Sequence, residues 1–215
     1  MIRAFPIVLP RECIVVCQGD SLTYGSDFTR TGTRGGINGS PARRSASPYP
    51  EALEAALRAR GWQGAKVVNR GYGDDTAAEG LRRWKGARGG DLTILLYGSN
   101  DVFRLFAGRN WLARYGAALC ELVDVAKRGG QVLLLELPPA RFPTYRTRFA
   151  LANEVLREVA RQKGVPALDL TPVFEGLGKI WVDGVHFRPA ANQAMAGRVA
   201  GVLTPSTTSS ARASS

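Results

Sequence analysis

The stretch Gly19-Asp20-Ser21-Leu22-Thr23-Tyr24-Gly25 follows directly on the apolar run Ile14-Val15-Val16-Cys17. A β-branched run that ends in Gly-Asp-Ser predicts a buried strand that places a serine at its carboxyl end. In open α/β sheets, ligands bind at the carboxyl ends of the strands, beside the point where the strand order reverses. A polar turn after a strand would use the same residue types, because serine is common in turns. The rest of the chain decides between these two interpretations.

The pattern of apolar residues predicts five strands that alternate with five helices. The expected strands are 13–17, 66–69, 92–97, 132–137 and 165–168, and the expected helices are 48–60, 76–85, 110–128, 144–163 and 189–202. Alternation at this spacing indicates βαβ units and a parallel sheet. The strands are nearly continuous apolar runs, as expected when helices cover both faces of the sheet. With right-handed crossovers, the sequence predicts an α/β protein with a three-layer sandwich.

The length and composition fit one soluble α/β domain. The chain has 215 residues, and 45% of them are hydrophobic. We expect a domain over residues 1–203 and a disordered tail over 204–215 (TPSTTSSARASS), because the tail has few apolar residues. The sequence contains no apolar run of the roughly 20 residues that a membrane span needs. Residues 1–10, as given, show no secretory signal.

The three cysteines, Cys13, Cys17 and Cys120, indicate small buried thiols. On one strand, the first two would lie about 13 Å apart, beyond the reach of a disulfide. Reduced cysteines are compatible with the cytoplasm, although the sequence leaves the compartment open. The spacing of cysteine and histidine matches no zinc site, so we expect no metal.

The chain carries a formal net charge of +11. Such a charge can attract nucleic acid, anionic lipid or acidic polysaccharide. The basic residues are scattered and form no nucleic-acid-binding module, so nucleic acid is not an expected partner. The long segment 26–47 leaves the serine turn directly, and we interpret it as a flap or substrate rim rather than an idle loop. Its basic residues are Arg30, Arg34, Arg43 and Arg44.

The only histidine of the chain, His186, is the candidate base for Ser21. A serine hydroxyl is a weak nucleophile until a base accepts its proton, and a third group commonly orients that base. Asp183 lies three residues before His186, and in a helical turn this spacing brings two side chains to the same face. A histidine in a surface loop is the alternative interpretation. Together, the three residues predict a Ser–His–Asp arrangement.

Asn100 follows the third predicted strand, in the sequence Gly98-Ser99-Asn100-Asp101. If the strand order is 2-1-3-4-5, the first and third strands flank the reversal point, and Ser21 and Asn100 share one crevice. An amide there could stabilise a developing oxyanion. A turn or a helix cap would also explain the asparagine.

Three blocks in this order resemble the GDSL/SGNH hydrolases: Gly-Asp-Ser-Leu near the start, Gly-x-Asn-Asp in the middle and Asp-x-x-His near the end. The resemblance covers roughly residues 13–202. It implies a flavodoxin-like fold with a parallel five-stranded sheet in the order 2-1-3-4-5. It also implies cofactor-free ester hydrolysis by Ser21, His186 and Asp183, with an oxyanion hole that includes the Ser21 N–H and the Asn100 side chain.

The family's second block departs from its usual pattern in this chain. The family has Gly-Asp-Thr there, and the glycine donates a backbone N–H to the oxyanion. In Asn69-Arg70-Gly71-Tyr72-Gly73-Asp74-Asp75-Thr76, Asp74 occupies the glycine position and Gly73 precedes it. Asp74 is therefore the expected donor, with Gly73 as the alternative. An aspartate tolerates an unusual backbone conformation less well than glycine.

These observations predict a serine esterase that acts through an acyl-enzyme. The expected substrate is a carbohydrate that carries small acyl groups such as acetyl, and it is possibly anionic because of the charge. Trp181 is close enough in sequence to the His186 loop to line the acyl or leaving-group side. The alternatives are a lysophospholipase or thioesterase, and a non-catalytic carbohydrate-binding module, which Asp74 would favour. The sequence leaves the oligomeric state open.

Overall fold

A parallel five-stranded sheet forms the centre of the molecule. The computed structural model describes residues 7–27, 45–87, 89–104, 108 and 110–206. The strands lie in the spatial order β3-β2-β4-β5-β6. Numbered along the chain among themselves, these strands have the order 2-1-3-4-5, which confirms the predicted fold. Their bounds are β2 Ile14–Gly19, β3 Lys66–Gly71, β4 Leu92–Leu96, β5 Gln131–Leu135 and β6 Ala167–Leu168.

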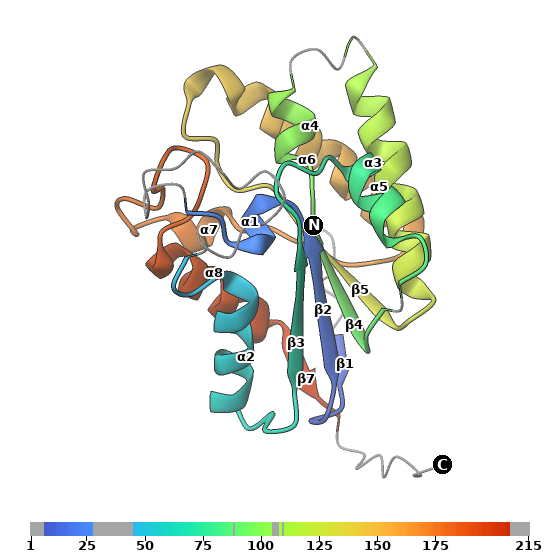
Figure 1. Cartoon of the computed structure of the whole chain (residues 1–215), viewed down its shortest axis with the longest axis vertical. Helices are drawn as coiled ribbons and strands as arrows, with labels where there is room; N and C mark the ends of the chain where they lie inside the picture. The colour runs from blue at the N-terminus through green and yellow to red at the C-terminus, as the bar shows by residue number, and fades with distance from the viewer. Residues whose placement is uncertain (1–6, 28–44, 88, 105–107, 109, 207–215) are drawn as a thin grey trace.

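Long helices cover both faces of this sheet and complete the three layers (Figure 1). Helices α2 (Tyr49–Ala59) and α8 (Pro189–Gly201) pack together on one face. The other face carries α3 (Ala77–Trp84), α5 (Trp111–Lys127) and α6 (Pro143–Lys163), with α5 packed between its neighbours. The five predicted helices are therefore confirmed, each to within a residue or two at its ends.

Three short helices begin where strands end, and the sequence analysis did not predict them. They are α1 (Ser21–Tyr24), α4 (Ser99–Phe103) and α7 (Thr171–Phe174). Each follows the carboxyl end of a strand, β2, β4 or β6. Their backbone turns hold the polar residues of the sheet's carboxyl edge in place.

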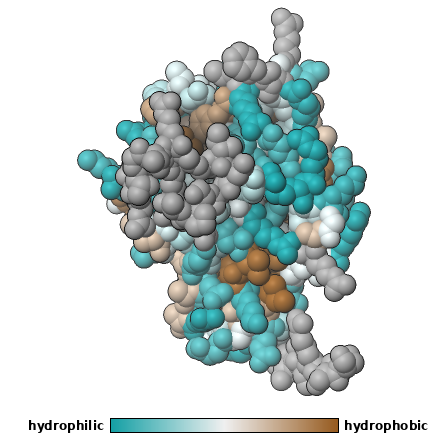
Figure 2. All heavy atoms as spheres, in the orientation of Figure 1, coloured by the Kyte–Doolittle hydropathy of each residue, from teal (hydrophilic) through white to brown (hydrophobic). Residues whose placement is uncertain are grey.

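The position of each strand in the sheet explains how deeply it is buried. Every residue of β4 is buried, as is all of β2 except Ile14, which agrees with helices on both faces. The edge strand β3 alternates between half-buried and exposed residues instead, and Val68 is 37% exposed. Figure 2 shows a small apolar patch bordered by hydrophilic residues, where Figure 1 draws the lower halves of β3 and β2. The prediction of a continuously buried strand is thus wrong for β3.

A second, two-stranded parallel sheet joins the two ends of the described chain. It pairs β1 (Ile7–Leu9) with β7 (Leu203–Pro205), and the Ser206 N–H donates to the Leu9 carbonyl at 2.8 Å. The tail predicted from residue 204 therefore begins too early, because Thr204 and Pro205 belong to β7. Residues 207–215 lie outside the described residues, and the division into a domain and a tail stays a prediction beyond this correction.

The three cysteines are free thiols. Cys13 and Cys17 are buried as predicted, whereas Cys120 is half-buried. Burial raises the pKa of the Cys13 thiol to about 11, which keeps it protonated and weakly reactive. Among the helices that the structure describes, none is long and apolar enough to cross a bilayer.

Candidate active site

Ser21, His186 and Asp183 lie in one chain of hydrogen bonds at the carboxyl edge of the sheet. His186 Nε2 is 2.9 Å from Ser21 Oγ, and His186 Nδ1 is 2.7 Å from Asp183 Oδ2. With the ring proton on Nδ1, the imidazole donates to Asp183 and accepts from the Ser21 hydroxyl. Ser21 is 6% exposed and His186 is 7% exposed. The Ser21 hydroxyl is therefore hydrogen-bonded to an imidazole that is shielded from bulk water.

The segment that carries Asp183 and His186 is a loop closed by a β-bridge between Trp181 and Phe187. The Val182 N–H donates to the His186 carbonyl at 2.8 Å, which holds the two sides of the loop together. The predicted helical turn between Asp183 and His186 does not form. Instead, Asp183 Oδ1 accepts from the His186 N–H at 2.9 Å, so an Asx-type turn brings the carboxylate to the imidazole.

The surroundings of Asp183 keep it ionised. Burial alone would raise its pKa, but the hydrogen bond and the charge of His186 act in the opposite direction. The backbone N–H groups of Val185 and His186 also stabilise the carboxylate. The resulting pKa of Asp183 is about 2. A carboxylate at this position holds the imidazole in one tautomer and stabilises it once it accepts a proton.

The turn that carries Ser21 depends on its neighbours on both sides. Asp20 caps α1, because its side chain accepts from the Leu22 N–H at 2.9 Å. Gly19 leaves no room for a side chain, since a Cβ there would lie 2.5 Å from the Leu96 carbonyl oxygen. As the first residue of α1, Ser21 has a backbone N–H without a partner inside the helix. That N–H can donate to a ligand beside the hydroxyl.

Asn100 lies in α4, directly after β4, and Asp74 lies on the loop that follows β3. Asn100 Nδ2 donates to the Asp75 carbonyl at 3.0 Å, which uses one of the two amide N–H bonds and leaves the other for a ligand. Asp74 has φ +63°, and in the described part of the chain it is the only non-glycine residue with a positive φ. Arg104 Nη2 donates to the Asp74 carbonyl at 2.7 Å and supports this strained turn.

Two further carboxyl groups near the site accept hydrogen bonds from backbone N–H groups. Asp101 Oδ2 accepts from the Ala77 N–H at 3.0 Å, which ties α4 to the start of α3. Asp20 is fully buried, and its Oδ2 has no hydrogen-bond partner in the described part of the chain. Burial, with the charges of Asp101, Asp75 and Asp74, raises the pKa of Asp20 to about 7, although the Leu22 N–H acts against the shift.

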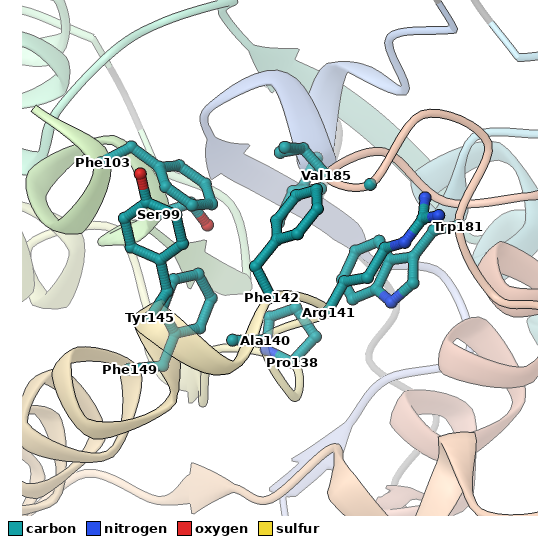
Figure 3. A pocket seen from close by; sticks show the side chains of 12 residues that line it. Ser99, Phe103, Pro138, Ala140, Arg141, Phe142, Tyr145, Phe149, Trp181 and Val185 are labelled. Carbon is teal, nitrogen blue, oxygen red and sulfur yellow. The ribbon is translucent and has the colours of Figure 1, made fainter.

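An apolar cavity opens next to the triad (Figure 3). It lies beside Leu22 and Val185, the chain neighbours of Ser21 and His186. Its space open to the centre of a water molecule is only about 10 Å³, about what one water needs. The other lining residues are mainly apolar and aromatic: Phe103, Pro138, Ala140, Phe142, Tyr145, Phe149 and Trp181, with Ser99, Arg141 and Gly184. We call this space the acyl-side cavity.

Phe142 narrows this cavity. Figure 3 shows its ring between the aromatic side chains of Phe103 and Tyr145 and the indole of Trp181. The ring packs on Gly184 of the His186 loop so closely that a Cβ at Gly184 would lie 2.9 Å from Phe142 Cζ. Phe142 is nevertheless 43% exposed, which is unusual for a large aromatic side chain.

Trp181 lines both the acyl-side cavity and a larger groove. Its indole stacks on Phe187 with ring centroids 5.1 Å apart, and Phe187 stacks in turn on Phe174 at 5.3 Å. The groove has about 550 Å³ open to water centres. The predicted rim residues Arg30, Arg34, Arg43 and Arg44 lie outside the described residues.

Sequence reasoning named Trp181 but did not identify the other aromatic residues of the acyl-side cavity or Arg104. The cavity residues come from α1, α4, the 138–149 segment and the His186 loop, which are far apart in the chain, so no local pattern marks them. The aromatic residues of the 138–149 segment follow a run of prolines after β5, which is a weak sign of a shaped loop at the site.

The sequence profile of the GDSL-like lipase/acylhydrolase family matches residues 17–194. No curated protein matches the chain. Among solved structures, the fold is similar to that of LAE5, an α/β hydrolase from the metagenome of Lake Arreo, Spain, with a TM-score of 0.72 and 24% identity. That match covers 91% of this chain and 98% of the other.

Two further similar structures are named as esterases. The acetylxylan esterase Axe2 from Geobacillus stearothermophilus has a TM-score of 0.69 and 22% identity, covering 92% of this chain and 96% of the other. A putative arylesterase from Agrobacterium tumefaciens has a TM-score of 0.65 and 23% identity, covering 87% and 96%. These likenesses establish the fold, with five parallel strands between layers of helices.

Proposed function

The chain belongs to the GDSL-like lipase/acylhydrolase family and is an ester-hydrolysing serine hydrolase, and we propose that Ser21, His186 and Asp183 form its catalytic triad. The observation that carries this proposal is the hydrogen-bond chain from Ser21 Oγ through both nitrogens of His186 to Asp183 Oδ2. The family membership and these two hydrogen bonds argue against a non-catalytic carbohydrate-binding module.

In the first half of the reaction, Ser21 Oγ attacks the carbonyl carbon of the ester while His186 Nε2 accepts the hydroxyl proton. The tetrahedral intermediate then collapses, the carbon–oxygen bond to the alcohol breaks, and His186 returns the proton to the departing alcohol oxygen. An acyl-enzyme remains on Ser21. Because Asp183 is ionised, it stabilises the imidazolium that exists between these two proton transfers.

In the second half, His186 accepts a proton from a water molecule, and the water oxygen attacks the acyl carbon. The bond to Ser21 Oγ breaks, the serine recovers its proton from His186, and the carboxylic acid leaves. The proposed oxyanion donors are the Ser21 N–H, the Asp74 N–H and the second N–H of the Asn100 amide, with the Gly73 N–H as the alternative to Asp74. The hydrogen bond from Asn100 to the Asp75 carbonyl supports this assignment because it orients the amide.

For the substrate, we propose a small acyl group, such as acetyl, on a carbohydrate. The acyl-side cavity supports the small acyl group, because the space open to the centre of a water molecule is only about 10 Å³, which suits a methyl group better than an alkyl chain. A lysophospholipid or a long-chain thioester would need Phe142 and its neighbours to move apart. The groove behind Trp181 offers room for a much larger alcohol part.

A labelling experiment with an ester panel tests this proposal. A fluorophosphonate probe should label the wild type at Ser21 and should label Ser47→Ala equally, since Ser47 lies outside the triad. Ser21→Ala should not be labelled. With 4-nitrophenyl acetate, butyrate, octanoate and palmitate, kcat/KM should be highest for acetate. Absence of labelling would contradict the triad, and a preference for palmitate would favour the lipid-directed alternative.

A further inference from the structure

The groove behind Trp181 is lined by an excess of positive charge. Its lining includes three cationic side chains, Arg141, Lys179 and Arg188, against a single carboxylate, Glu175. We call it the basic groove. Arg141, Lys179 and Glu175 are exposed residues, so their charges face the solvent of the groove. An excess of fixed cations attracts anionic ligands and raises the rate at which they arrive.

One wall of the basic groove is formed by the loop that carries the proposed catalytic base. Trp181 and Arg141 line both the basic groove and the acyl-side cavity. Figure 3 shows the Arg141 side chain next to the indole of Trp181. The Arg188 N–H donates to the Ile180 carbonyl, and Arg188 Nε donates to the Trp181 carbonyl at 3.0 Å, so the loop is braced on this side. A ligand in the groove therefore lies on a rigid wall beside the reaction centre.

An ester consists of an acyl part and an alcohol part, and the two spaces beside the proposed triad differ in the kind of group that they can bind. The acyl-side cavity is narrow and aromatic, which suits a small apolar acyl group. The basic groove is about 550 Å³ and combines cations with a fixed indole, which suits a larger polar group that has an apolar face. Sugar rings have this character, and an isolated phosphate would leave most of that volume and the indole unused.

We propose that the basic groove binds the alcohol part of the substrate as an acidic oligosaccharide, in which uronic-acid carboxylates face Arg141 and Lys179 and a sugar ring packs on Trp181. This inference rests on the proposed esterase function and names its substrate class. It also assigns the attraction of an anionic polymer to Arg141 and Lys179, independently of the arginines of segment 26–47.

The test compares two acetylated oligosaccharides of equal length, one neutral and one with a uronic-acid residue. At low salt, the wild type should have the higher kcat/KM for the acidic substrate, and 0.3 M NaCl should remove most of the difference. Lys179→Gln and Arg141→Gln should each lower kcat/KM for the acidic substrate about threefold, in line with exposed charge pairs. Both variants should lower kcat/KM for the neutral substrate less than for the acidic one, because the neutral sugar has no carboxylate to pair with the lost charge.

The matched control is Lys85→Gln, which removes one exposed positive charge at the C-terminal end of α3, away from the groove. It should leave both substrates unaffected. A binding measurement that needs no turnover completes the test: by titration calorimetry, the de-acetylated acidic oligosaccharide should bind the wild type more tightly than it binds Lys179→Gln.

Three outcomes would overturn the proposal. Equal kcat/KM for the two oligosaccharides at low salt would mean that the groove does not recognise carboxylates. Equal losses with Lys85→Gln and Lys179→Gln would assign the effect to net charge. A salt-sensitive loss with Lys179→Gln on an anionic lysophospholipid, but not on the saccharide, would assign the groove to a lipid headgroup. Failure of the esterase proposal is distinct, since the wild type would then not hydrolyse 4-nitrophenyl acetate.

Discussion

The three residues of the proposed triad act through one another, and this determines how their variants should combine. Ser21→Ala and His186→Ala should each lower kcat for 4-nitrophenyl acetate by about 10³-fold or more, and the double variant should lose little beyond either one. Circular dichroism would verify that each variant is folded. Because the chain has no second histidine, near-normal turnover by His186→Ala would contradict the assignment.

Substitutions at the proposed oxyanion donors should differ in how much activity they remove. Asn100→Ala removes an oriented amide and should lower kcat by about 10²- to 10³-fold, the usual effect of losing one such donor. Asp74→Gly keeps the backbone N–H and relieves the positive φ of +63°, so activity should be preserved or modestly raised. Steady-state kinetics of both variants would test this. An inactive but folded Asp74→Gly beside a nearly normal Asn100→Ala would mean that the Asp74 carboxyl takes part in the reaction.

Asp20 links the stability of the protein to pH. Its carboxyl group has a pKa of about 7 in the folded protein, against an ordinary value of 3.8. Between these values the folded state binds more protons than the unfolded state, so the free energy of unfolding should fall as the pH rises from about 4 to about 7. Each pKa unit corresponds to about 1.4 kcal/mol.

Asp20→Asn should flatten this dependence. Its side-chain oxygen can still accept from the Leu22 N–H, but the group no longer ionises. Urea unfolding at pH 5, 6 and 7 would measure the effect. The pKa of Asp101 is also raised, to about 6, mainly by burial, so the interval between pH 6 and 7 is the most informative. Identical slopes for the wild type and Asp20→Asn in that interval would contradict the prediction.

At the scale of single elements, we expect the loop between β5 and α6 to limit the size of the acyl group. Phe142 immediately precedes Pro143, the first residue of α6, and its ring is held against Gly184. Phe142→Ala should therefore open the acyl-side cavity to longer chains. Since each buried methylene contributes about 0.8 kcal/mol, the ratio of kcat/KM for 4-nitrophenyl hexanoate to that for acetate should rise about tenfold or more.

Two controls accompany this measurement. Leu151→Ala removes another exposed apolar side chain, 38% exposed, from α6 itself, and it should leave the ratio unchanged. Phe142→Leu should give an intermediate ratio because it retains part of the bulk. An unchanged ratio in Phe142→Ala would show that another residue limits the length of the acyl chain.

At the scale of the whole molecule, the β1–β7 pair closes the chain on itself. Ile7, Leu9 and Leu203 are nearly fully buried, at 3%, 1% and 2% exposure. Ending the chain after Val202 should therefore lower the free energy of unfolding by about 3 kcal/mol or more, since burying one such side chain contributes about 1.5 to 3 kcal/mol. Denaturant unfolding would measure this loss.

The matched control ends the chain after Ser206 and retains β7. It should be as stable as the full chain and should keep the same kcat at 25 °C. Equal stability of the two truncated chains would show that the β1–β7 pairing contributes little, and the predicted tail boundary at residue 204 would then describe the energetics of the chain correctly.

The sequence by itself predicted the parallel sheet and, through the family resemblance, its strand order, and it supplied the three candidate residues of the proposed triad. Strands and long helices are visible because their apolar periodicity is local, and a parallel α/β topology restricts how such elements can connect. Ser21 and Asn100 could be placed together because each follows a strand and parallel strands end at one edge. A single histidine left one candidate for the base.

Only the tertiary structure decided the shape and charge of the spaces around the triad. Phe103 ends α4, Phe142 lies between β5 and α6, and Trp181 lies on the His186 loop. Their contacts depend on how these elements pack rather than on any local pattern. The same holds for β1 and β7, which are three residues long and separated by most of the chain. Short segments with distant partners carry almost no periodic signal, because the partner, not the segment, supplies the free energy that orders them.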